Sequence, residues 1–471
     1  MGTGVGRAVI AAAALGSGIA FLDGTVVNVA LRSIGKDLDA SLAQLQWITN
    51  GYLLSLASLI LLGGSLGDRF GRRRVFVIGT IWFATASLLC GLAPNAEVLI
   101  AARVLQGVGG ALLTPGSLAM IEGAFVQEDR APAIGAWSGL TGIAGAVGPF
   151  VGGGLVQYAD WRWIFLINLP IAAITVLIAV RFVPESRDPN ASVHFDIPGA
   201  ILASAALAGA TYALIEWGGA TAWVAVGVAI LAGVGFVVVE RRTAEPMLVL
   251  GIFRDRTFSA ANAMTLLVYG ALGAQGFFVT IQLQTVSGYG ALAAGAAFVP
   301  TTLVMLLLAS PGGRLGQRIG PRIPMTVGPL VIAAGVLLML RIGPDVTYVT
   351  DVLPGAIVFG LGLSLMVATL TATVLAAAPN EHAGIASGVN NAVARAGALL
   401  AVAALPVAVG LHGAEYADPV AFDDAFRMAM MICAGLLAVG GVMSWLTIPA
   451  TALEPEAEPT PDALDGGVGA D

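Results

Sequence analysis

The feature that most constrains this chain is a succession of long apolar segments with little sequence between them. A helix needs about 20 apolar residues to cross a bilayer, and segments of about this length recur fourteen times along the sequence. They cover approximately Met1–Leu31, Leu45–Leu66, Val75–Leu92, Glu97–Met120, Ala133–Val156, Trp163–Val183, Ile197–Trp217, Ala220–Val239, Phe258–Leu283, Leu292–Ser310, Ile323–Arg341, Tyr348–Leu375, Ile385–Leu411 and Ala425–Ile448. Hydrophobic residues make up 57% of the chain and charged residues 11%, against about 45–50% and about 25% in soluble proteins. The sequence therefore predicts an all-α polytopic membrane protein with about 14 transmembrane helices.

A stretch rich in glycine and arginine occurs twice. Residues 64–74 read Gly-Ser-Leu-Gly-Asp-Arg-Phe-Gly-Arg-Arg-Arg, and residues 313–322 read Gly-Arg-Leu-Gly-Gln-Arg-Ile-Gly-Pro-Arg, 249 positions later (313 − 64). Gly, Leu, Gly, Arg, Gly and Arg recur in register, which indicates two related halves. The glycines favour a tight turn and a close approach of helices, because a residue without Cβ reaches positive φ and adds no bulk.

Two repeats of six spans account for twelve of the fourteen, and the surplus pair lies between them. We therefore expect two pseudo-symmetric six-helix lobes plus a two-helix insert. The expected boundaries are 1–190 for the first lobe, 191–250 for the insert with its flanking cytoplasmic loops, 251–449 for the second lobe and 450–471 for a tail. The tail is rich in Pro, Ala, Gly and acidic residues and has no basic residue, a composition that predicts disorder.

The basic residues predict the orientation. If the N-terminus is cytoplasmic, fifteen basic residues fall in segments on the cytoplasmic side and five on the other. Cytoplasmic loops carry the excess of Lys and Arg in membrane proteins. With an even number of spans, we expect both termini to be cytoplasmic.

Asp23, Arg103 and Arg395 are charged residues that lie well inside predicted spans rather than at their ends. A carboxylate inside an apolar span costs several kcal/mol unless it is paired or protonated, so Asp23 is a candidate for proton uptake and release. The alternative is a structural hydrogen bond to a neighbouring helix. Arg103 lies about a turn inside the fourth span, where the alternative to a functional role is a side chain that reaches the interface.

Five motifs of the first half together resemble the major facilitator superfamily, and in particular its fourteen-span drug:proton antiporter branch. They are Leu22–Leu31 in the first span, Gly64–Arg74 between the second and third, Arg103–Ala111 in the fourth, Gly145–Gly153 in the fifth and Asp160–Pro170 before the sixth. The resemblance implies two lobes that rock about a central cavity, in agreement with the paired repeats. It also implies that Asp23 couples transport to protons and that Arg103 assists the proton transfer.

The resemblance further implies a cytoplasmic gate around the first glycine- and arginine-rich stretch. In the outward-open state, Asp68 would pair with a basic residue, for which Arg130 is the candidate, and meet the start of the eleventh span. Arg72 and its neighbours can also act simply as charges that fix the topology. The residues assigned to this gate are Gly64, Asp68, Arg69, Gly71, Arg72 and Arg130.

The fifth span carries a motif that the resemblance associates with antiporters and with limiting leakage. Its residues are Gly145, Gly148, Pro149, Gly152 and Gly153. Proline removes a backbone hydrogen bond and glycines let helices touch, so close helix packing is the simpler interpretation.

Polar and aromatic residues of several spans are candidates for a substrate cavity. Polar groups inside a membrane either line a cavity or bond between helices, and aromatic rings can stack on a planar or cationic molecule. Gln275 and Gln282 are seven residues apart, which places them on one helical face. The candidates are Phe21, Asn28, Trp47, Tyr52, Gln275, Phe278, Gln282 and Asn391.

These features predict a proton-coupled antiporter that exports amphipathic drugs or other small organic molecules from the cytoplasm. The alternative is a dedicated natural-product or lipid exporter of the same fold. A phosphate-binding loop of the G-x-x-x-x-G-K-[ST] type is absent, which argues against ATP as the driving force. No catalytic cluster indicates an enzyme, and the three scattered histidines predict no metal site. We expect no cofactor and no nucleic acid, a monomer in a bacterial cell membrane, and protons, an amphipathic organic substrate and lipid as partners.

Overall fold

The computed structural model describes residues 4–187, 195–243, 245–378, 383–411 and 415–453. In these ranges fourteen helical segments are long and apolar enough to cross a membrane, as predicted. Disorder was expected for the acidic tail 450–471, and residues 454–471 of it lie outside the described residues. The three histidines His194, His382 and His412 also lie outside them.

The helices follow one another with short connections. The first half contains α1 (Gly4–Asp37), α2 (Leu42–Phe70), α3 (Arg72–Gly91), α4 (Ala96–Ala124), α5 (Gln127–Tyr158), α6 (Trp163–Leu166) and α7 (Asn168–Phe182), with α6 and α7 in one span. The insert is α8 (Ile197–Ile215) and α9 (Ala220–Arg242). The second half contains α10 (Arg256–Thr285), α11 (Ala291–Ala296), α12 (Val299–Ile319), α13 (Arg322–Leu338), α14 (Leu353–Ala376), α15 (Ala383–Ala408) and α16 (Pro419–Thr447), with α11 and α12 in one span. Short helical turns at Leu250–Arg254, Met339–Arg341, Tyr348–Val352 and Glu415–Ala417 complete the described part.

Several helices extend beyond the apolar segments that predicted them. Helix α2 begins at Leu42 rather than Leu45 because Ser41 caps it. The Ser41 hydroxyl accepts a hydrogen bond from the Gln44 backbone N–H at 3.3 Å, and the Gln44 side chain accepts one from the Ser41 N–H at 2.9 Å. Hydropathy marks only the part of a helix inside the hydrocarbon, whereas capping groups decide where the helix begins.

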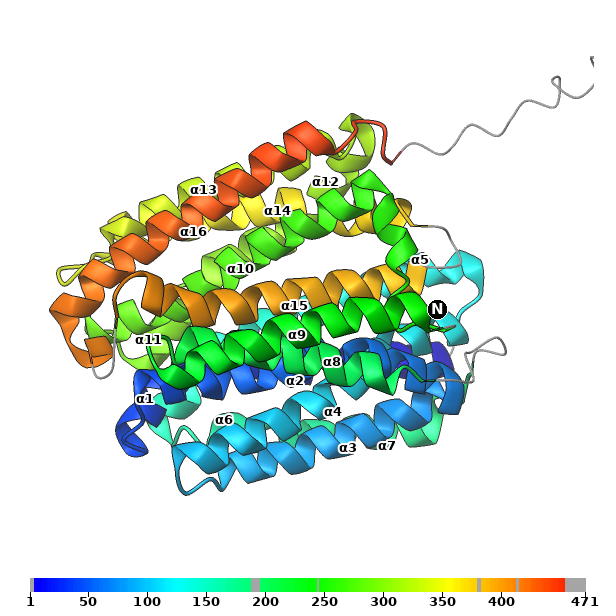
Figure 1. The fold of residues 1–471 in the computed structure, drawn as a ribbon, viewed down its shortest axis with the longest axis horizontal. Helices are drawn as coiled ribbons and strands as arrows, with labels where there is room; N and C mark the ends of the chain where they lie inside the picture. Colours follow the sequence, from blue (N-terminus) through cyan, green and yellow to red (C-terminus); the bar gives the residue numbers. More distant parts are fainter. Residues whose placement is uncertain (1–3, 188–194, 244, 379–382, 412–414, 454–471) are drawn as a thin grey trace, which may run out of the picture.

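The start of α1 and the end of α16 lie at the same end of the bundle (Figure 1). We call this the terminal end and the opposite one the distal end. An even number of spans requires this arrangement.

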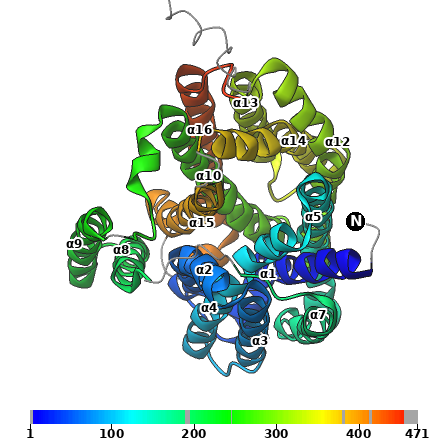
Figure 2. The ribbon, with the colours of Figure 1, turned by 90° about the vertical axis from the view of Figure 1, so that its right-hand side faces the viewer.

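The two halves pack in the same way. The neighbours α2 and α4, α3 and α4, α1 and α5, α1 and α7, and α3 and α7 of the first half correspond to α12 and α14, α13 and α14, α10 and α15, α10 and α16, and α13 and α16 of the second. Figure 2 shows the halves as two groups of helices. This confirms the predicted pseudo-symmetric lobes.

The repeated stretches form equivalent turns. Only Gly71 separates α2 from α3, with φ +115°, and Gly320, which lies 249 positions later (320 − 71), has φ +79° after α12. Both values lie in the region that favours glycine. The chain that follows the last helix of each half contacts its turn: the Ser186 carbonyl accepts from the Arg72 N–H at 3.0 Å, and the Ile448 carbonyl accepts from Arg322 Nε at 3.0 Å.

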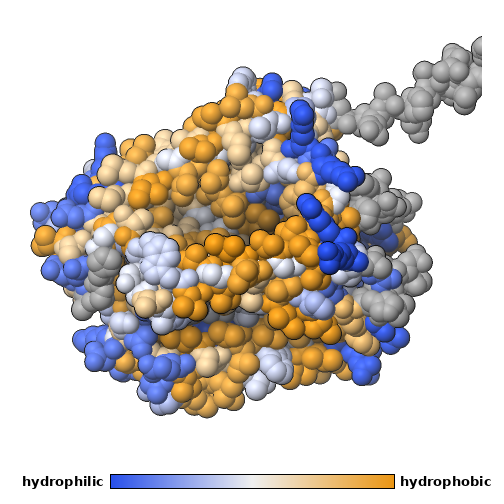
Figure 3. All heavy atoms as spheres, in the orientation of Figure 1, coloured by the Kyte–Doolittle hydropathy of each residue, from blue (hydrophilic) through white to orange (hydrophobic). Residues whose placement is uncertain are grey.

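The insert lies on the outside of both lobes. Helix α8 packs against α2 of the first lobe and α15 of the second, while α9 packs mainly on α8. Apolar side chains of α9 such as Val224 and Leu231 are 69% and 75% exposed. Figure 3 shows a broad hydrophobic middle with hydrophilic residues toward both ends. Such a surface is solvated by lipid tails rather than by water.

Candidate functional site

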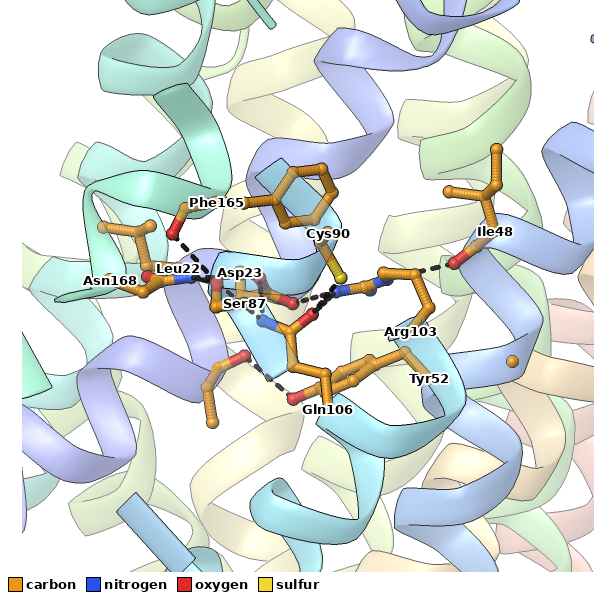
Figure 4. A network of polar contacts seen from close by, with 12 residues as sticks. Leu22, Asp23, Ile48, Tyr52, Ser87, Cys90, Arg103, Gln106, Phe165 and Asn168 are labelled. Carbon is orange, nitrogen blue, oxygen red and sulfur yellow. Dashed lines mark hydrogen bonds and ion pairs between the residues drawn. The ribbon is translucent and has the colours of Figure 1, made fainter. Parts of the chain in front are cut away.

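Asp23 and Arg103 form an ion pair in the middle of the first lobe (Figure 4). Asp23 comes from α1 and Arg103 from α4, and their side chains are 0% and 1% exposed. The structure therefore brings together the two charged residues that the sequence singled out in this half. A pair this deep is isolated from both ends of the bundle.

The carboxylate of Asp23 also accepts two amide hydrogen bonds. Gln106 Nε2 donates to its Oδ1 at 2.8 Å, and Asn168 Nδ2 donates to the same oxygen at 3.2 Å. Three donors from α4 and α7 thus surround one acid. Hydrogen bonds to the charged form of a carboxylate favour that form.

The guanidinium of Arg103 is held from the other side. Its Nε donates to the Ile48 carbonyl at 3.1 Å, and its Nη1 donates to Gln106 Oε1 at 2.7 Å. Its Cζ lies 4.4 Å from the centroid of the Tyr52 ring, a cation–π geometry. Arg103 is therefore not a side chain that reaches the interface.

Ser87 of α3 extends the network. Its hydroxyl accepts from Gln106 at 3.2 Å and from Asn168 at 3.0 Å and donates to the Phe165 carbonyl at 2.8 Å. Ser87, Gln106 and Asn168 were not among the site residues predicted from the sequence. Gln106 could have been predicted from the sequence, because a spacing of three from Arg103 puts both side chains on one helical face. Ser87 and Asn168 join the site only through tertiary packing.

The chemistry of this network follows from its isolation. Breaking a buried ion pair by removing one partner costs about 3–5 kcal/mol, because it leaves an uncompensated charge. A proton on Asp23 would cancel its charge and release Arg103 from the pair.

The glycines of the fifth-span motif pack α5 against both lobes. A Cβ at Gly148 would meet Thr25 and Leu22 of α1, and a Cβ at Gly153 would come within 2.7 Å of Leu292 in α11. Gly145 and Gly152 face α1 in the same way, through Phe21 and Val26. These contacts are the close packing that the sequence predicted as the simpler interpretation.

Comparison with known proteins identifies the family. The model of the Major Facilitator Superfamily matches residues 13–402. The chain belongs to the major facilitator superfamily. The puromycin resistance protein of Streptomyces alboniger is 35% identical over 460 residues, which cover 94% of this chain and 91% of the relative. The tetracenomycin C resistance and export protein of Streptomyces glaucescens is 36% identical over 406 residues, which cover 84% and 74%.

A solved structure agrees with the fold. The POT family transporter PepTSo matches with a TM-score of 0.69 and 15% identity, covering 94% of this chain and 97% of that one. At this identity the likeness shows the fold alone. The family and the relatives confirm the predicted resemblance: the chain is a multi-pass membrane transporter related to drug and antibiotic resistance exporters, and not an enzyme.

In this superfamily member, side chains of one lobe bind the backbone of the other near the distal end. Gln46 Nε2 of α2 donates to the carbonyls of Val402 at 2.9 Å and Ala403 at 3.2 Å in α15. Gln284 Nε2 of α10 donates to the Val29 carbonyl of α1 at 2.9 Å.

Two further bonds strengthen the same closure. Arg32 of α1 donates to the Gln284 carbonyl. The Tyr416 hydroxyl, between α15 and α16, donates to the Ala40 carbonyl at 2.9 Å. The described hydrogen bonds between lobes gather in the distal half, so the structure is closed at that end.

The residues assigned to the gate lie at the terminal end. Asp68 pairs with Arg72 at 2.9 Å across the Gly71 turn, and Arg72 Nη1 donates to the Ala119 carbonyl at 3.2 Å. Arg130 Nε donates to the Phe125 carbonyl at 3.1 Å. Asp68 is therefore bound to Arg72 in this state. The Asp68–Arg130 pair was expected for the outward-open state, and it stays a prediction.

The candidate cavity residues of the first lobe separate into different environments. Tyr52 joins the buried network, and its hydroxyl donates to the Ala20 carbonyl at 3.3 Å. Trp47 packs on Tyr212 of the insert with ring centroids 6.3 Å apart. Phe21 is 45% exposed.

Asn28 is half-buried, and its Oδ1 has no hydrogen-bond partner within the described part of the chain. This oxygen is an acceptor in α1 that a bound molecule can satisfy. Asn28 therefore remains a candidate for substrate binding in the first lobe, because its side-chain oxygen can still accept a hydrogen bond.

The two glutamines of α10 lie on one face, as their spacing predicts. Gln275 Nε2 contacts the Met339 sulfur at 3.4 Å, and Gln282 Nε2 donates to the Ile342 carbonyl at 2.9 Å and to Asp423 Oδ1 at 2.5 Å. Both amides therefore bind within the second lobe. Of the two readings left open by the sequence, these contacts favour bonding between helices.

The remaining two candidates also lie apart. Phe278 is fully buried and stacks on Phe422 with ring centroids 5.7 Å apart. Asn391 of α15 is exposed and donates to the Ser387 carbonyl of its own helix at 3.0 Å. The predicted substrate residues thus do not form one cluster in this state.

Two clefts lie away from the buried network. A cleft of about 550 Å³ between the insert and the second lobe is lined by apolar groups, among them Leu214, Trp217 and Leu436. A smaller one of about 280 Å³ at the distal end is lined by Arg32, Lys36 and other residues, with no acidic side chain in its lining.

Proposed function

We propose that this transporter exports small organic molecules from the cytoplasm in exchange for protons, by alternating access. The observation that carries the proposal is the buried Asp23–Arg103 pair with its amide donors. A charged network inside a membrane protein is costly to build and is characteristic of proton relays. The resistance and export functions in the names of the relatives support export as the direction.

In the proposed cycle, protonation of Asp23 is the event that changes the energy of the first lobe. The neutral acid no longer balances Arg103, so the hydrogen bonds to Gln106 and Ile48 must carry the buried cation. Rocking of the lobes would expose Asp23 to one side of the membrane at a time. The glycine contacts between α5 and α1 would then keep water from crossing beside the network.

The orientation is part of the proposal. Most basic residues outside the spans belong to segments at the terminal end, which favours the cytoplasm there. The closed distal end then faces outward, and this structure corresponds to an inward-facing state. In the outward-facing state, Asp68 would exchange Arg72 for Arg130 and close the cytoplasmic end.

The test uses purified protein in vesicles that contain a pH-sensitive dye and carry an imposed proton gradient. Wild type, Asp23→Asn and the control Asp424→Asn, which changes an exposed acid of α16, are compared with cationic, neutral and anionic organic compounds. We expect compound-dependent proton movement in wild type and in the control, and none in Asp23→Asn.

Compound flux without any proton movement in wild type would contradict the antiport proposal and leave a uniporter. Proton movement that persists in Asp23→Asn would contradict the role of Asp23 but not the antiport proposal.

A second candidate function is dedicated export of one natural product. The relatives named for a single antibiotic, puromycin or tetracenomycin C, favour it. Transport of a single compound class in the same panel would support a dedicated exporter, and transport of several unrelated classes would support a multidrug exporter.

A further inference from the structure

Arg395 is the second arginine inside the membrane region, and its surroundings differ from those of Arg103. It lies near the middle of α15, twelve residues after Ala383 and thirteen before Ala408 (395 − 383 and 408 − 395). A charged side chain at this depth is expensive unless something compensates it. Asp23 compensates the charge of Arg103, and Arg395 needs a comparable partner.

The described residues provide no such partner. None of the ion pairs of the described chain includes Arg395, and its Nε is buried without a hydrogen-bond acceptor. The titratable side chains that interact with it electrostatically are Tyr52 of α2 and Tyr269 of α10. Phenols are neutral near pH 7, so neither balances the charge.

Arg395 lies on a helix that contacts both lobes. Helix α15 packs against α10 of its own lobe and α2 of the other, and the two tyrosines come from these two helices. Arg395 therefore lies where the lobes meet. Its side chain is only partly buried, whereas Arg103 is closed off on all sides. A guanidinium offers a planar set of donors that matches a carboxylate.

We propose that Arg395 binds an anionic group of the exported molecule, most suitably a carboxylate. This inference rests on the proposed export function and adds the chemical class of the substrate. The Asp23–Arg103 pair is neutral as a unit, so Arg395 leaves one uncompensated positive charge near the lobe interface. Lipid headgroups lie at the membrane surfaces and not at this depth, so the anion belongs to the transported molecule.

The distal cleft supports the same substrate class. Arg32 and Lys36, both exposed, contribute to its lining, which contains no acid. In the proposed orientation this cleft is on the outward side, where the molecule is released. A molecule with an acid group would meet positive charge both at Arg395 and at the exit.

The experiment compares three compounds with one ring system: 1-pyrenebutyric acid, its primary amide and 1-pyrenebutylamine. At neutral pH they are an anion, a neutral molecule and a cation of nearly equal size. Their binding to the purified full-length protein is measured by pyrene fluorescence. Wild type is expected to bind the acid at least about tenfold more tightly than the amide, as for a charge-assisted hydrogen bond.

Arg395→Gln should remove the preference for the acid, whereas Arg395→Lys should retain part of it because the charge remains. Arg427→Gln, which removes an exposed arginine of α16 paired with Asp423, is the matched control and should bind like wild type.

Equal binding of acid and amide to wild type, or tighter binding of the amine, would overturn the proposal whatever the variants do. An unchanged acid preference in Arg395→Gln would overturn the assignment to this residue. Selective acid binding, together with flux of the acid but no proton movement in the vesicle assay, would keep this inference and refute the antiport proposal.

Discussion

Replacing Asp23 with Asn is expected to lower the free energy of unfolding by about 3–5 kcal/mol. The amide still accepts from Gln106 and Asn168, so these two bonds survive. What is lost is the negative charge beside Arg103, which is 1% exposed and cannot reach solvent. The cost is therefore that of an arginine buried without its counter-ion.

Arg103→Gln should lower the free energy of unfolding by less than Asp23→Asn does. A lone Asp23 can be neutralised by a proton, whereas a lone arginine stays charged. The double variant removes both charges, so we expect it to be more stable than the sum of the single effects predicts, by about 1–3 kcal/mol.

The assay is unfolding by a denaturing detergent, followed by tryptophan fluorescence, for wild type, the two single variants and the double variant. Asp424→Asn is the control and should lie within about 0.5 kcal/mol of wild type because its side chain is exposed. Additive effects, or a loss below about 1 kcal/mol for Asp23→Asn, would refute the view that the pair is electrostatically isolated.

Three further predictions follow from the contacts. Gly148→Val should destabilise the protein by about 1–3 kcal/mol and speed proton leak into vesicles, because α5 touches α1 at this glycine. The control Gly142→Val places its side chain in open space and should have neither effect. Equal proton leak in both variants would contradict the packing argument. Gln46→Leu removes hydrogen bonds between the lobes that are worth about 1–2 kcal/mol, so the ratio of protein closed at the distal end to protein open there should fall about five- to thirtyfold. The ratio is measured from distances between spin labels on the two lobes. An unchanged distance distribution would show that other contacts hold this end closed. Exchange of a monovalent anion for one proton moves two charges across the membrane, so a potential of about 100 mV, inside negative, should favour export by about 4.6 kcal/mol. Anion transport in vesicles is measured with a potential set by potassium and valinomycin. Transport that does not change with this potential would exclude the stoichiometry of one anion to one proton.

The spans and the repeat were predictable because they depend on local composition. Hydropathy alone locates a membrane helix, and the recurrence of Gly71 as Gly320 reports a turn that only glycine adopts readily. Asp23 and Arg103 stood out for a similar local reason, since a charge in an apolar segment needs no tertiary information to be noticed.

The orientation of side chains within the bundle was not predictable in the same way. Helix α2 carries polar residues on several sides, so its sequence could not tell that Trp47 faces the insert while Tyr52 faces the network. The Asn168 contact with Asp23 joins helices 145 residues apart and depends on how α7 packs. The state of the gate was also beyond the sequence, because Asp68 has more than one possible basic partner and the conformation selects between them.

The separation of the two membrane arginines bears on how coupling is achieved. In the proposed mechanism, protons act at Asp23, whose counter-ion is sealed inside the first lobe, and the substrate anion binds Arg395 of the second lobe. Substrate and proton therefore do not compete for one carboxylate, and their exchange has to pass through the movement of the lobes. Tyr52 connects the two regions, since its ring lies under Arg103 and its helix α2 packs against α15, which carries Arg395. In the proposed cycle, a change in the negative charge beside either arginine would alter the interactions near the interface of α2 with α15, a surface between the lobes.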